Sequence, residues 1–186
     1  KFYMQKKINF IDLGKHPITN NFLNLSKPKN EFFYNLKLIF HSETKLVSLA
    51  KFVSPKKMFN EKYAHRASAS KTMQVAYTKL AELIKKEYKP KSILEIGSND
   101  GVFIKHFKGI NNLGVEPCKN LARITKKMGI KTYDDFWTYK LSKKIIKKHK
   151  RFDVIYSANT ISHIHNLDET FRAIDNSLND NGIFIL

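Results

Sequence analysis

Short apolar blocks alternate with amphipathic stretches along the second half of the chain. The blocks cover residues 92–96, 112–116, 129–133, 152–157 and 182–186, and each has the length of a buried strand. Helical spacing of apolar residues predicts helices between them, over about 118–128, 140–151 and 167–178. Strands that alternate with helices through short loops predict an α/β fold, a parallel sheet covered by helices on both faces.

The first third of the chain has a different pattern. Leu36, Leu38 and Phe40 alternate with other residues as in a strand, and a turn at 41–44 precedes a second extended piece at 45–49. A Ser/Ala-rich link at 63–70 leads into a predicted helix from about 71 to 87, which ends before Pro90. We therefore predict a small β-rich lobe at 1–68, a connecting helix at 69–90 and a sheet domain at 91–186.

Composition limits the class of protein. The 186 residues are 42% hydrophobic, which indicates a globular chain rather than a disordered one. No apolar run is long enough to cross a bilayer and the first residues lack a signal-peptide layout, so we expect a cytoplasmic location and no membrane partner. Cys118 is the single cysteine, which excludes an internal disulfide and a multi-cysteine metal site within this chain.

The formal net charge of +18 suggests an anionic partner such as a nucleic acid. The main basic stretch is a predicted helix with five lysines on its exposed side, Lys143, Lys144, Lys147, Lys148 and Lys150. Few aromatic or arginine residues interleave with them to stack on bases. We favour a solvated helix face, with attraction of a sugar nucleotide or of nucleic acid as the alternatives.

A glycine turn, residues 97–101, joins the first sheet strand to a helix-like stretch at 102–107. Such a corner is typical of nucleotide sites, because glycine lets the backbone approach the ligand and the helix end offers free N–H groups. A dinucleotide site requires glycine where Asn99 stands, and Asp100 adds a negative charge. The turn therefore favours a ligand with a cationic end, such as S-adenosylmethionine, whose ammonium and sulfonium could face Glu95 and Asp100. An ordinary strand-to-helix turn is the alternative.

Acidic and polar residues follow the next strands. Glu116 ends the second strand about 20 residues after Gly97, the separation at which a carboxylate accepts ribose hydroxyls. Asp135 and Phe136 follow the third strand and are candidates for a ledge under adenine, while Asn159 follows the fourth. Carboxyl ends of parallel strands share one rim, so we expect these residues to line one site. A solvated Glu116 and a core Phe136 are the alternatives.

Five stretches together resemble a known family, the S-adenosylmethionine-dependent sugar C-methyltransferases, which act on nucleotide-linked deoxy-keto-sugars. The stretches are IDLGKHPITNNFL at 11–23, YAHRASAS at 63–70, LEIGSNDG at 94–101, GVEP at 114–117 and NTISHI at 159–164. His65 and Ala67 depart from the family pattern, which has a second tyrosine and a serine at these places.

The resemblance implies a Rossmann-like class I methyltransferase sheet and a set of site residues. The implied cofactor contacts are Glu95, Gly97, Ser98, Asn99, Asp100, Gly101, Glu116, Pro117, Asp135, Phe136 and Asn159. His163 is implied as a hydrogen-bond donor or proton relay beside an enolate, and Tyr63 and His65 as residues that close over the sugar. The alternatives are a backbone-capping role for His163 and lobe packing for the other two.

Two features of the family are missing here. The family has two cysteine pairs that bind a structural zinc, whereas His41 and Thr44 occupy the positions of the second pair. One histidine cannot hold a tetrahedral zinc, so we expect none in this chain. The general-base motif of the family follows the fifth strand, where this chain stops at Leu186, and the chain starts without methionine. We therefore expect a fragment, truncated after the fifth strand, that binds cofactor. An RNA or other small-molecule methyltransferase and a non-catalytic nucleotide-binding module are the alternatives.

Overall fold

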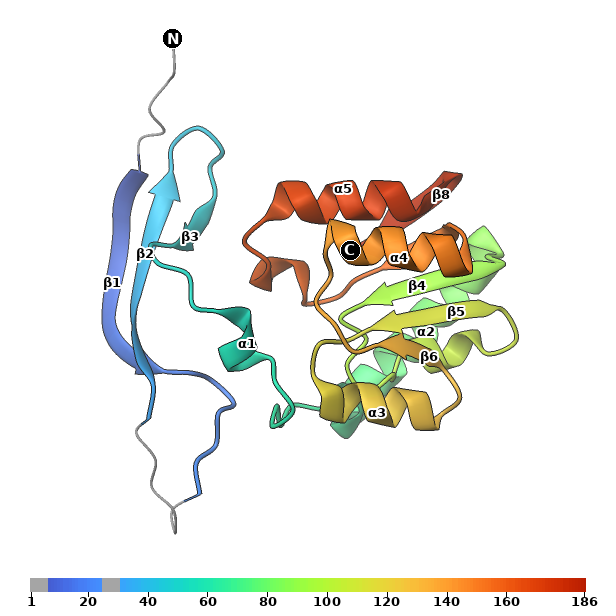
Figure 1. Cartoon of the computed structure of the whole chain (residues 1–186), viewed down its shortest axis with the longest axis horizontal. Coiled ribbons are helices and arrows are strands. Elements are labelled where there is room, and N and C mark those ends of the chain that lie inside the picture. The colour runs from blue at the N-terminus through green and yellow to red at the C-terminus, as the bar shows by residue number, and fades with distance from the viewer. Residues whose placement is uncertain (1–6, 25–30) are drawn as a thin grey trace. The chain divides into compact units, whose positions relative to one another are not determined.

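The computed structural model describes residues 7–24 and 31–186 and divides into two compact units, Lys1–Phe59 and Asn60–Leu186 (Figure 1). The second unit thus includes the link at 63–70 and the helix that follows it. No helix in the described ranges combines the length and the apolar character needed to cross a bilayer.

The first unit is built on an antiparallel sheet of three strands in the order β1-β2-β3. These are β1 (Lys7–Pro17), β2 (Phe33–His41) and β3 (Val47–Leu49), and the short helix α1 (Pro55–Met58) follows. The predicted strands near 36–40 and 45–49 are confirmed, and the turn between them closes with a 2.8 Å hydrogen bond from Lys45 N–H to His41 O. The pattern did not predict β1, because register shifts at Asn9/Ile11 and Asp12/Lys15 interrupt the alternation of its side chains.

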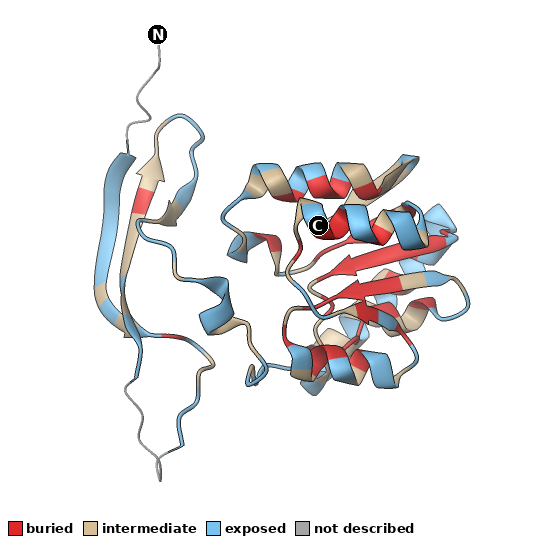
Figure 2. Ribbon diagram, in the orientation of Figure 1, coloured by how far each residue is buried: buried red, intermediate tan, exposed pale blue. Residues whose placement is uncertain are grey.

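The second unit contains a parallel sheet of five strands in the order β6-β5-β4-β7-β8. The strands are β4 (Ser92–Ile96), β5 (Asn111–Val115), β6 (Lys131–Tyr133), β7 (Phe152–Tyr156) and β8 (Leu178–Ile185). All five residues of β4 are buried, as Figure 2 shows for the sheet centre. The strand order reverses between β4 and β7, and ligands of open α/β sheets bind at the carboxyl ends of the strands beside such a reversal.

Helices cover both faces of this sheet, as predicted (Figure 1). Leu141 and Ile145 of α4 (Tyr139–His149) and Ala173 and Ile174 of α5 (Leu167–Ser177) pack on one face. The other face is covered by α2 (Lys71–Tyr88), the 3₁₀ helix η2 (Ile104–Phe107) and the end of α3 (Lys119–Lys127). There the ring of Phe103 lies 4.1 Å from that of Tyr156, which closes the core beside the carboxyl end of β7.

Local capping explains the limits of α2. The Ser70 side chain accepts a hydrogen bond from Met73 N–H at the start of the helix. At the other end Lys89 has a left-handed φ of 44° and is followed by Pro90, which cannot continue a helix.

Two details differ from the sequence-based expectations. The stretch after the glycine turn forms only the four-residue η2, and not a longer helix. Strand β8 begins at Leu178, directly after α5, and not at residue 182.

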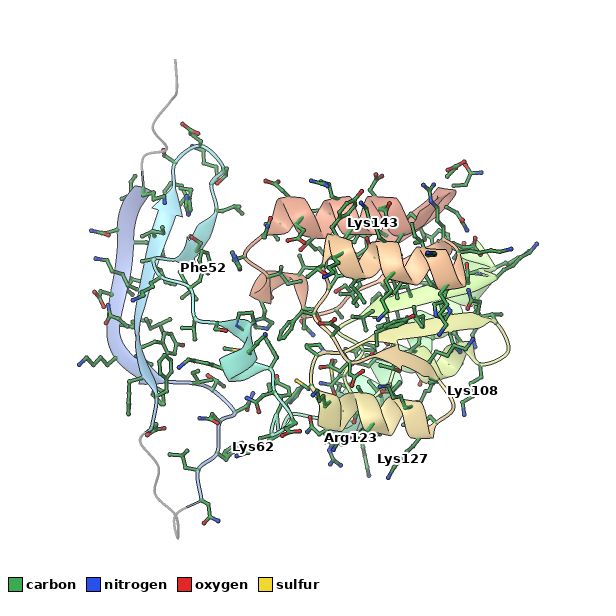
Figure 3. The ribbon with its side chains drawn as sticks, in the orientation of Figure 1. Phe52, Lys62, Lys108, Arg123, Lys127 and Lys143 are labelled. Atoms are coloured by element: carbon green, nitrogen blue, oxygen red, sulfur yellow. The ribbon has the colours of Figure 1, made fainter. Side chains whose placement is uncertain are left out.

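The lysines of the basic helix lie on the surface, which is compatible both with a solvated face and with attraction of an anionic partner. Its lysines 143, 144, 147, 148 and 150 are all exposed, while Leu141, Ser142 and Ile145 on the opposite side are buried. Figure 3 labels Lys143 of this helix. It also labels Arg123 and Lys127, two exposed basic residues of a different helix, α3. The lysines of α4 therefore contribute positive charge to the surface rather than to the core.

Candidate functional site

The glycine turn forms a tight loop at the carboxyl end of β4. Gly97, Asn99 and Gly101 have positive φ values of 74°, 48° and 80°, and they alternate with Ser98 and Asp100. Gly97 has to be glycine, because a Cβ at this position would overlap the side chain of Thr160 in the loop that follows β7. The loops after β4 and β7 therefore touch at Gly97.

Every backbone N–H of the loop donates to an acceptor within the protein. Gly97 and Ser98 donate to Val115 O at 2.8 and 3.1 Å, and Gly101 donates to Ser98 O at 2.9 Å. Asn99 N–H donates to Glu116 Oε2 at 2.8 Å, and Asp100 N–H donates to Asn99 Oδ1 at 2.9 Å. The free N–H groups expected at this corner are thus absent from the described loop, and a phosphate would find no unbonded donor there.

Glu116 joins the glycine turn to the start of α3. One carboxylate oxygen accepts from Asn99 N–H and the other from Cys118 N–H, both at 2.8 Å. Burial raises the pKa of Glu116, and these two N–H groups oppose that shift. A carboxylate has about four acceptor positions, and the two N–H groups together with a hydrogen bond from the Cys118 thiol leave one of them. The side chain is only 5% exposed, so Glu116 is a structural part of the loop and not a solvated strand end.

Glu95 lies on the inner side of the loop. Its carboxylate accepts from Ile104 N–H at 3.1 Å and is 5% exposed. Burial raises the pKa of Glu95 well above its usual value, and the nearby carboxylates of Glu116 and Asp100 raise it further. Glu95 thus holds η2 against the sheet.

Replacing Glu95 with glutamine is expected to stabilise the protein increasingly as the pH rises. A carboxyl whose folded pKa is raised supports the folded state below its unfolded pKa and loses that contribution as the pH rises through the folded pKa. Glutamine keeps an acceptor for Ile104 N–H and does not ionise. Thermal unfolding from pH 5 to 9 should show a melting temperature ~2–4 °C above wild type at the alkaline end. Glu87→Gln, the same change at an exposed site of α2, is the control. A pH-independent difference for Glu95→Gln would contradict this account.

The link at 63–70 lies directly on the loop. The Asn99 side chain accepts from Ala67 N–H at 2.9 Å and donates to His65 O at 3.4 Å. Ser68 donates to the Asp100 carboxylate through both its hydroxyl and its N–H. Tyr63 O accepts from Asn120 Nδ2 of α3 at 2.8 Å. The structure therefore brings Tyr63 and His65 to the same edge as the glycine turn, with their rings 6.4 Å apart in an edge contact.

The loops after β6 and β7 complete this edge. Asp135 Oδ1 accepts from Phe136 N–H, which forms a tight turn after β6. Asn159 is exposed and has a left-handed φ of 52°. His163 is exposed at the end of the 3₁₀ helix η3 (Ile161–His163), and its N–H donates to Thr160 O at 2.9 Å.

Two of the other expected contacts face inward. Ser98 is 1% exposed, its hydroxyl lies beside Gly114 of β5, and it has no hydrogen-bond partner among the described residues. Asp100 is also 1% exposed. Pro117 is partly buried in the turn between Glu116 and α3.

Sequence reasoning missed Thr160, and its only signal was its position next to Asn159.

Metal ligands do not gather in the parts of the chain that the structure describes. No three His, Cys, Asp or Glu side chains within 7–24 and 31–186 are placed to share an ion. His41 Nε2 lies 2.8 Å from Ser48 Oγ on the neighbouring strand. The expectation that this chain holds no zinc remains a prediction.

A surface hollow lies at the opposite edge of the sheet and does not belong to the candidate site. Residues 108–112 and 128–131, around the amino ends of β5 and β6, line it. The side-chain amides of Asn111 and Asn112 already donate to the carbonyls of His149 and Phe107. We therefore place the functional site at the carboxyl edge, where the loops with functional side chains meet.

Comparison with known families identifies the second unit. Residues 63–186, about two thirds of the chain, match the family described as "Methyltransferase domain". The chain belongs to this methyltransferase family. The match begins at Tyr63, the first residue of the link that lies on the glycine turn. Residues 4–59 match a second family, described as "Putative zinc binding domain".

Individual relatives agree with this assignment. The chain is 22% identical to the C-methyltransferase NovU of Streptomyces niveus over 96% of its length and 44% of NovU, so it spans less than half of that relative. Its fold is similar to that of the plantazolicin methyltransferase BamL, solved with SAH. The TM-score is 0.50 at 16% identity, and the match covers 63% of this chain and 47% of BamL. The match to a "putative s-adenosyl-l-methionine-dependent methyltransferase" of Methanococcus maripaludis has a TM-score of 0.51 at 20% identity and covers 73% of this chain and 67% of that protein. The predicted Rossmann-like class I methyltransferase fold is confirmed.

Proposed function

We propose that this methyltransferase chain binds S-adenosylmethionine at the carboxyl edge of its sheet and serves methyl transfer to a carbon of a nucleotide-linked keto-deoxysugar. The family match and the similarity to a C-methyltransferase support the reaction class. The net charge of +18 supports an anionic acceptor, because exposed lysines attract the diphosphate of a sugar nucleotide.

One observation carries the cofactor assignment. All five N–H groups of the loop at 97–101 are bonded within the protein, and the carboxylates of Asp100 and Glu116 lie in or beside it. A pyrophosphate needs free N–H donors and is repelled by carboxylates, whereas a sulfonium with an ammonium group is attracted by them. The residues present therefore fit S-adenosylmethionine and not a dinucleotide.

Eight of the candidate residues have a place in this proposal. The remaining acceptor position of Glu116 would take a ribose hydroxyl, Asp135 and Phe136 would border the adenine, and the backbone at Gly97 and Asn159 would lie along the amino-acid end. Bound there, S-adenosylmethionine supplies an electrophilic methyl group. His163 would donate a hydrogen bond to the oxygen that gains charge on the acceptor, while Tyr63 and His65 hold the sugar in position.

Isothermal titration calorimetry tests the cofactor assignment directly. The whole chain at pH 7.5 should bind S-adenosylmethionine with a dissociation constant of roughly 1–100 μM, and NAD should give no heat of binding. Titration of a thymidine-diphosphate sugar into the cofactor-loaded chain tests the acceptor class. Tighter binding of NAD, or no binding of S-adenosylmethionine, would contradict the proposal. Binding of an RNA oligonucleotide in place of the sugar nucleotide would instead support the RNA methyltransferase alternative.

Cofactor affinity is also expected to decline as the pH is lowered. Burial raises the pKa of Glu116, so its carboxyl takes up a proton at a higher pH than an exposed glutamate. The protonated form no longer attracts a cation, and binding of the cation should therefore release a proton in that range. Calorimetry between about pH 5 and 8, in two buffers of different ionisation enthalpy, measures both effects. An affinity that stays constant over this pH range would show that the charge of the Glu116 carboxylate does not contribute to binding of the cationic ligand.

A further inference from the structure

The link at 63–70, here called the strap, is bonded to the cofactor loop along most of its length. Four of its backbone or side-chain groups make these bonds: Ala67 N–H, His65 O, and the N–H and hydroxyl of Ser68. All of them meet either Asn99 or Asp100. The strap therefore covers the two loop residues that distinguish this turn from a dinucleotide turn.

Asn99 has the geometry of a clamp. Its side-chain amide accepts from Ala67 N–H and donates to His65 O, so it satisfies a donor and an acceptor two residues apart on the strap. The residue also adopts a left-handed φ of 48°, which glycine adopts without strain and most residues avoid. Asparagine adopts this conformation more readily than most other residues, so it can place an amide at a left-handed position at little cost.

Asp100 is directed at the strap rather than at open space. One carboxylate oxygen accepts Ser68 N–H at 3.3 Å, the other accepts the Ser68 hydroxyl, and the side chain is 1% exposed. While the strap is in this position, the Asp100 carboxylate is covered. It can influence a cofactor through its charge, but Ser68 determines its orientation.

The strap has a rigid anchor on its other side. Gln74 Nε2 of α2 donates to Ser68 O at 2.7 Å, and Ser70 caps the same helix. Helix α2 is itself fixed to the sheet by Ala81 and Ile84, each 1% exposed. The position of Ser68 is thus determined by α2, and through Ser68 that of Asp100.

We propose that the strap is a closing wall of the cofactor site, held by Asn99 and Asp100, and that Ser68 is the positioning residue for the Asp100 carboxylate. This inference rests on the proposed cofactor. Because the strap and the ligand share the loop, holding the strap and binding the cofactor favour each other, and linkage requires the effect to be reciprocal. Binding of S-adenosylmethionine should therefore slow hydrogen exchange of the strap amides, and loss of the Asn99 hydrogen bonds should lower the affinity for the cofactor.

Hydrogen exchange of the whole chain, with and without S-adenosylmethionine, tests the clamp. Asn99→Gly removes the amide and keeps the left-handed backbone without strain. Without cofactor, the Ala67 and Ser68 amides of this variant should exchange at least ~10-fold faster than in wild type, because their hydrogen-bonded state is less populated. S-adenosylmethionine should slow the same amides in wild type and bind Asn99→Gly about 10-fold more weakly, as expected for the loss of one to two hydrogen bonds.

The matched control is Lys89→Gly, which also replaces a left-handed residue by glycine but at the far end of α2. Its strap amides should exchange as in wild type. Equal exchange in wild type and Asn99→Gly, or faster exchange of the wild-type strap with cofactor, would overturn the proposal. Absence of S-adenosylmethionine binding to wild type would instead defeat the proposed function, while the cofactor-free exchange would still decide whether Asn99 holds the strap.

Ser68 is tested by its own pair of variants. Ser68→Ala removes the hydrogen bond from the hydroxyl to Asp100. It should lower the affinity for S-adenosylmethionine about 5-fold, in keeping with the loss of one hydrogen bond to a charged group. Ser68→Thr keeps the hydroxyl and should restore most of the affinity. Ser70→Ala, which changes only the cap of α2, controls for general loosening of the strap. The same affinity in Ser68→Ala, Ser68→Thr and wild type would remove Ser68 from the positioning role.

Discussion

Gly97→Ala is expected to destabilise the protein by about 3 kcal/mol and to abolish measurable S-adenosylmethionine binding. The left-handed φ of 74° costs an alanine about 1 kcal/mol, and the overlap of its Cβ with Thr160 adds about 2 kcal/mol or displaces the loop after β7. Displacement of either loop would move Asn159 and the glycine turn apart. Urea unfolding gives the stability change, and calorimetry below the unfolding transition gives the affinity.

Gly129→Ala separates the two contributions to this loss. Gly129 has a similar φ of 81°, but nothing lies within 4 Å of the position of an added Cβ. This control should lose only the ~1 kcal/mol that the backbone conformation costs, and it should bind cofactor as wild type does. Equal losses in the two variants would show that the contact with Thr160 has no energetic weight.

Glu116→Ala is expected to lower the affinity for S-adenosylmethionine by more than ~10-fold and to reduce the free energy of unfolding by roughly 3 kcal/mol. The affinity is expected to fall because the ribose contact proposed for Glu116 is lost, and the stability falls because Asn99 N–H and Cys118 N–H each lose a charged acceptor. The carboxylate lies 2.8 Å from both N–H groups and joins the loop to the start of α3 through charge-assisted hydrogen bonds. Calorimetry and urea unfolding measure the two effects separately.

Asp153→Ala is the matched control for Glu116. The Asp153 carboxylate accepts from Lys91 N–H and Ser92 N–H at 2.8 and 3.0 Å, so it makes the same kind of contact at the amino edge of the sheet. Its replacement should reduce stability and leave the S-adenosylmethionine affinity within about twofold of wild type, because the site lies at the carboxyl edge. An equal loss of affinity in both variants would attribute the effect of Glu116 to unfolding rather than to the cofactor.

The predictable part of the fold is the part in which local pattern and tertiary burial agree. Strand β4 is buried on both faces and is rich in apolar residues, namely Ile93, Leu94 and Ile96, and Leu141 and Ile145 mark the buried side of α4 at helical spacing. Strand β1 was missed because its register shifts disturb the alternation on which recognition of a strand depends.

The site divides in the same way. Glu116 could be placed beside the glycine turn from its spacing alone, because parallel neighbouring strands bring their carboxyl ends together. The directions of the Glu95 and Asp100 side chains could not be predicted, because a carboxylate turns toward whichever N–H or hydroxyl the fold supplies. For Glu95 the donor is Ile104 N–H, nine residues later in the chain. For Asp100 the donor is Ser68, 32 residues earlier.

By itself, the amino-acid sequence determined the order of the sheet strands and helices in the second unit, the glycine turn and the acid that follows the second strand, because each depends on residues close together in the chain. Only the tertiary structure decided that every N–H of the turn is occupied, that Thr160 requires glycine at position 97, and that the strap covers Asn99 and Asp100. The contacts of Thr160 and of the strap join residues more than 30 positions apart, and three of the five N–H groups of the turn donate to residues 17 or 18 positions away. They arise from the meeting of separate loops at one edge of the sheet, which no local pattern records.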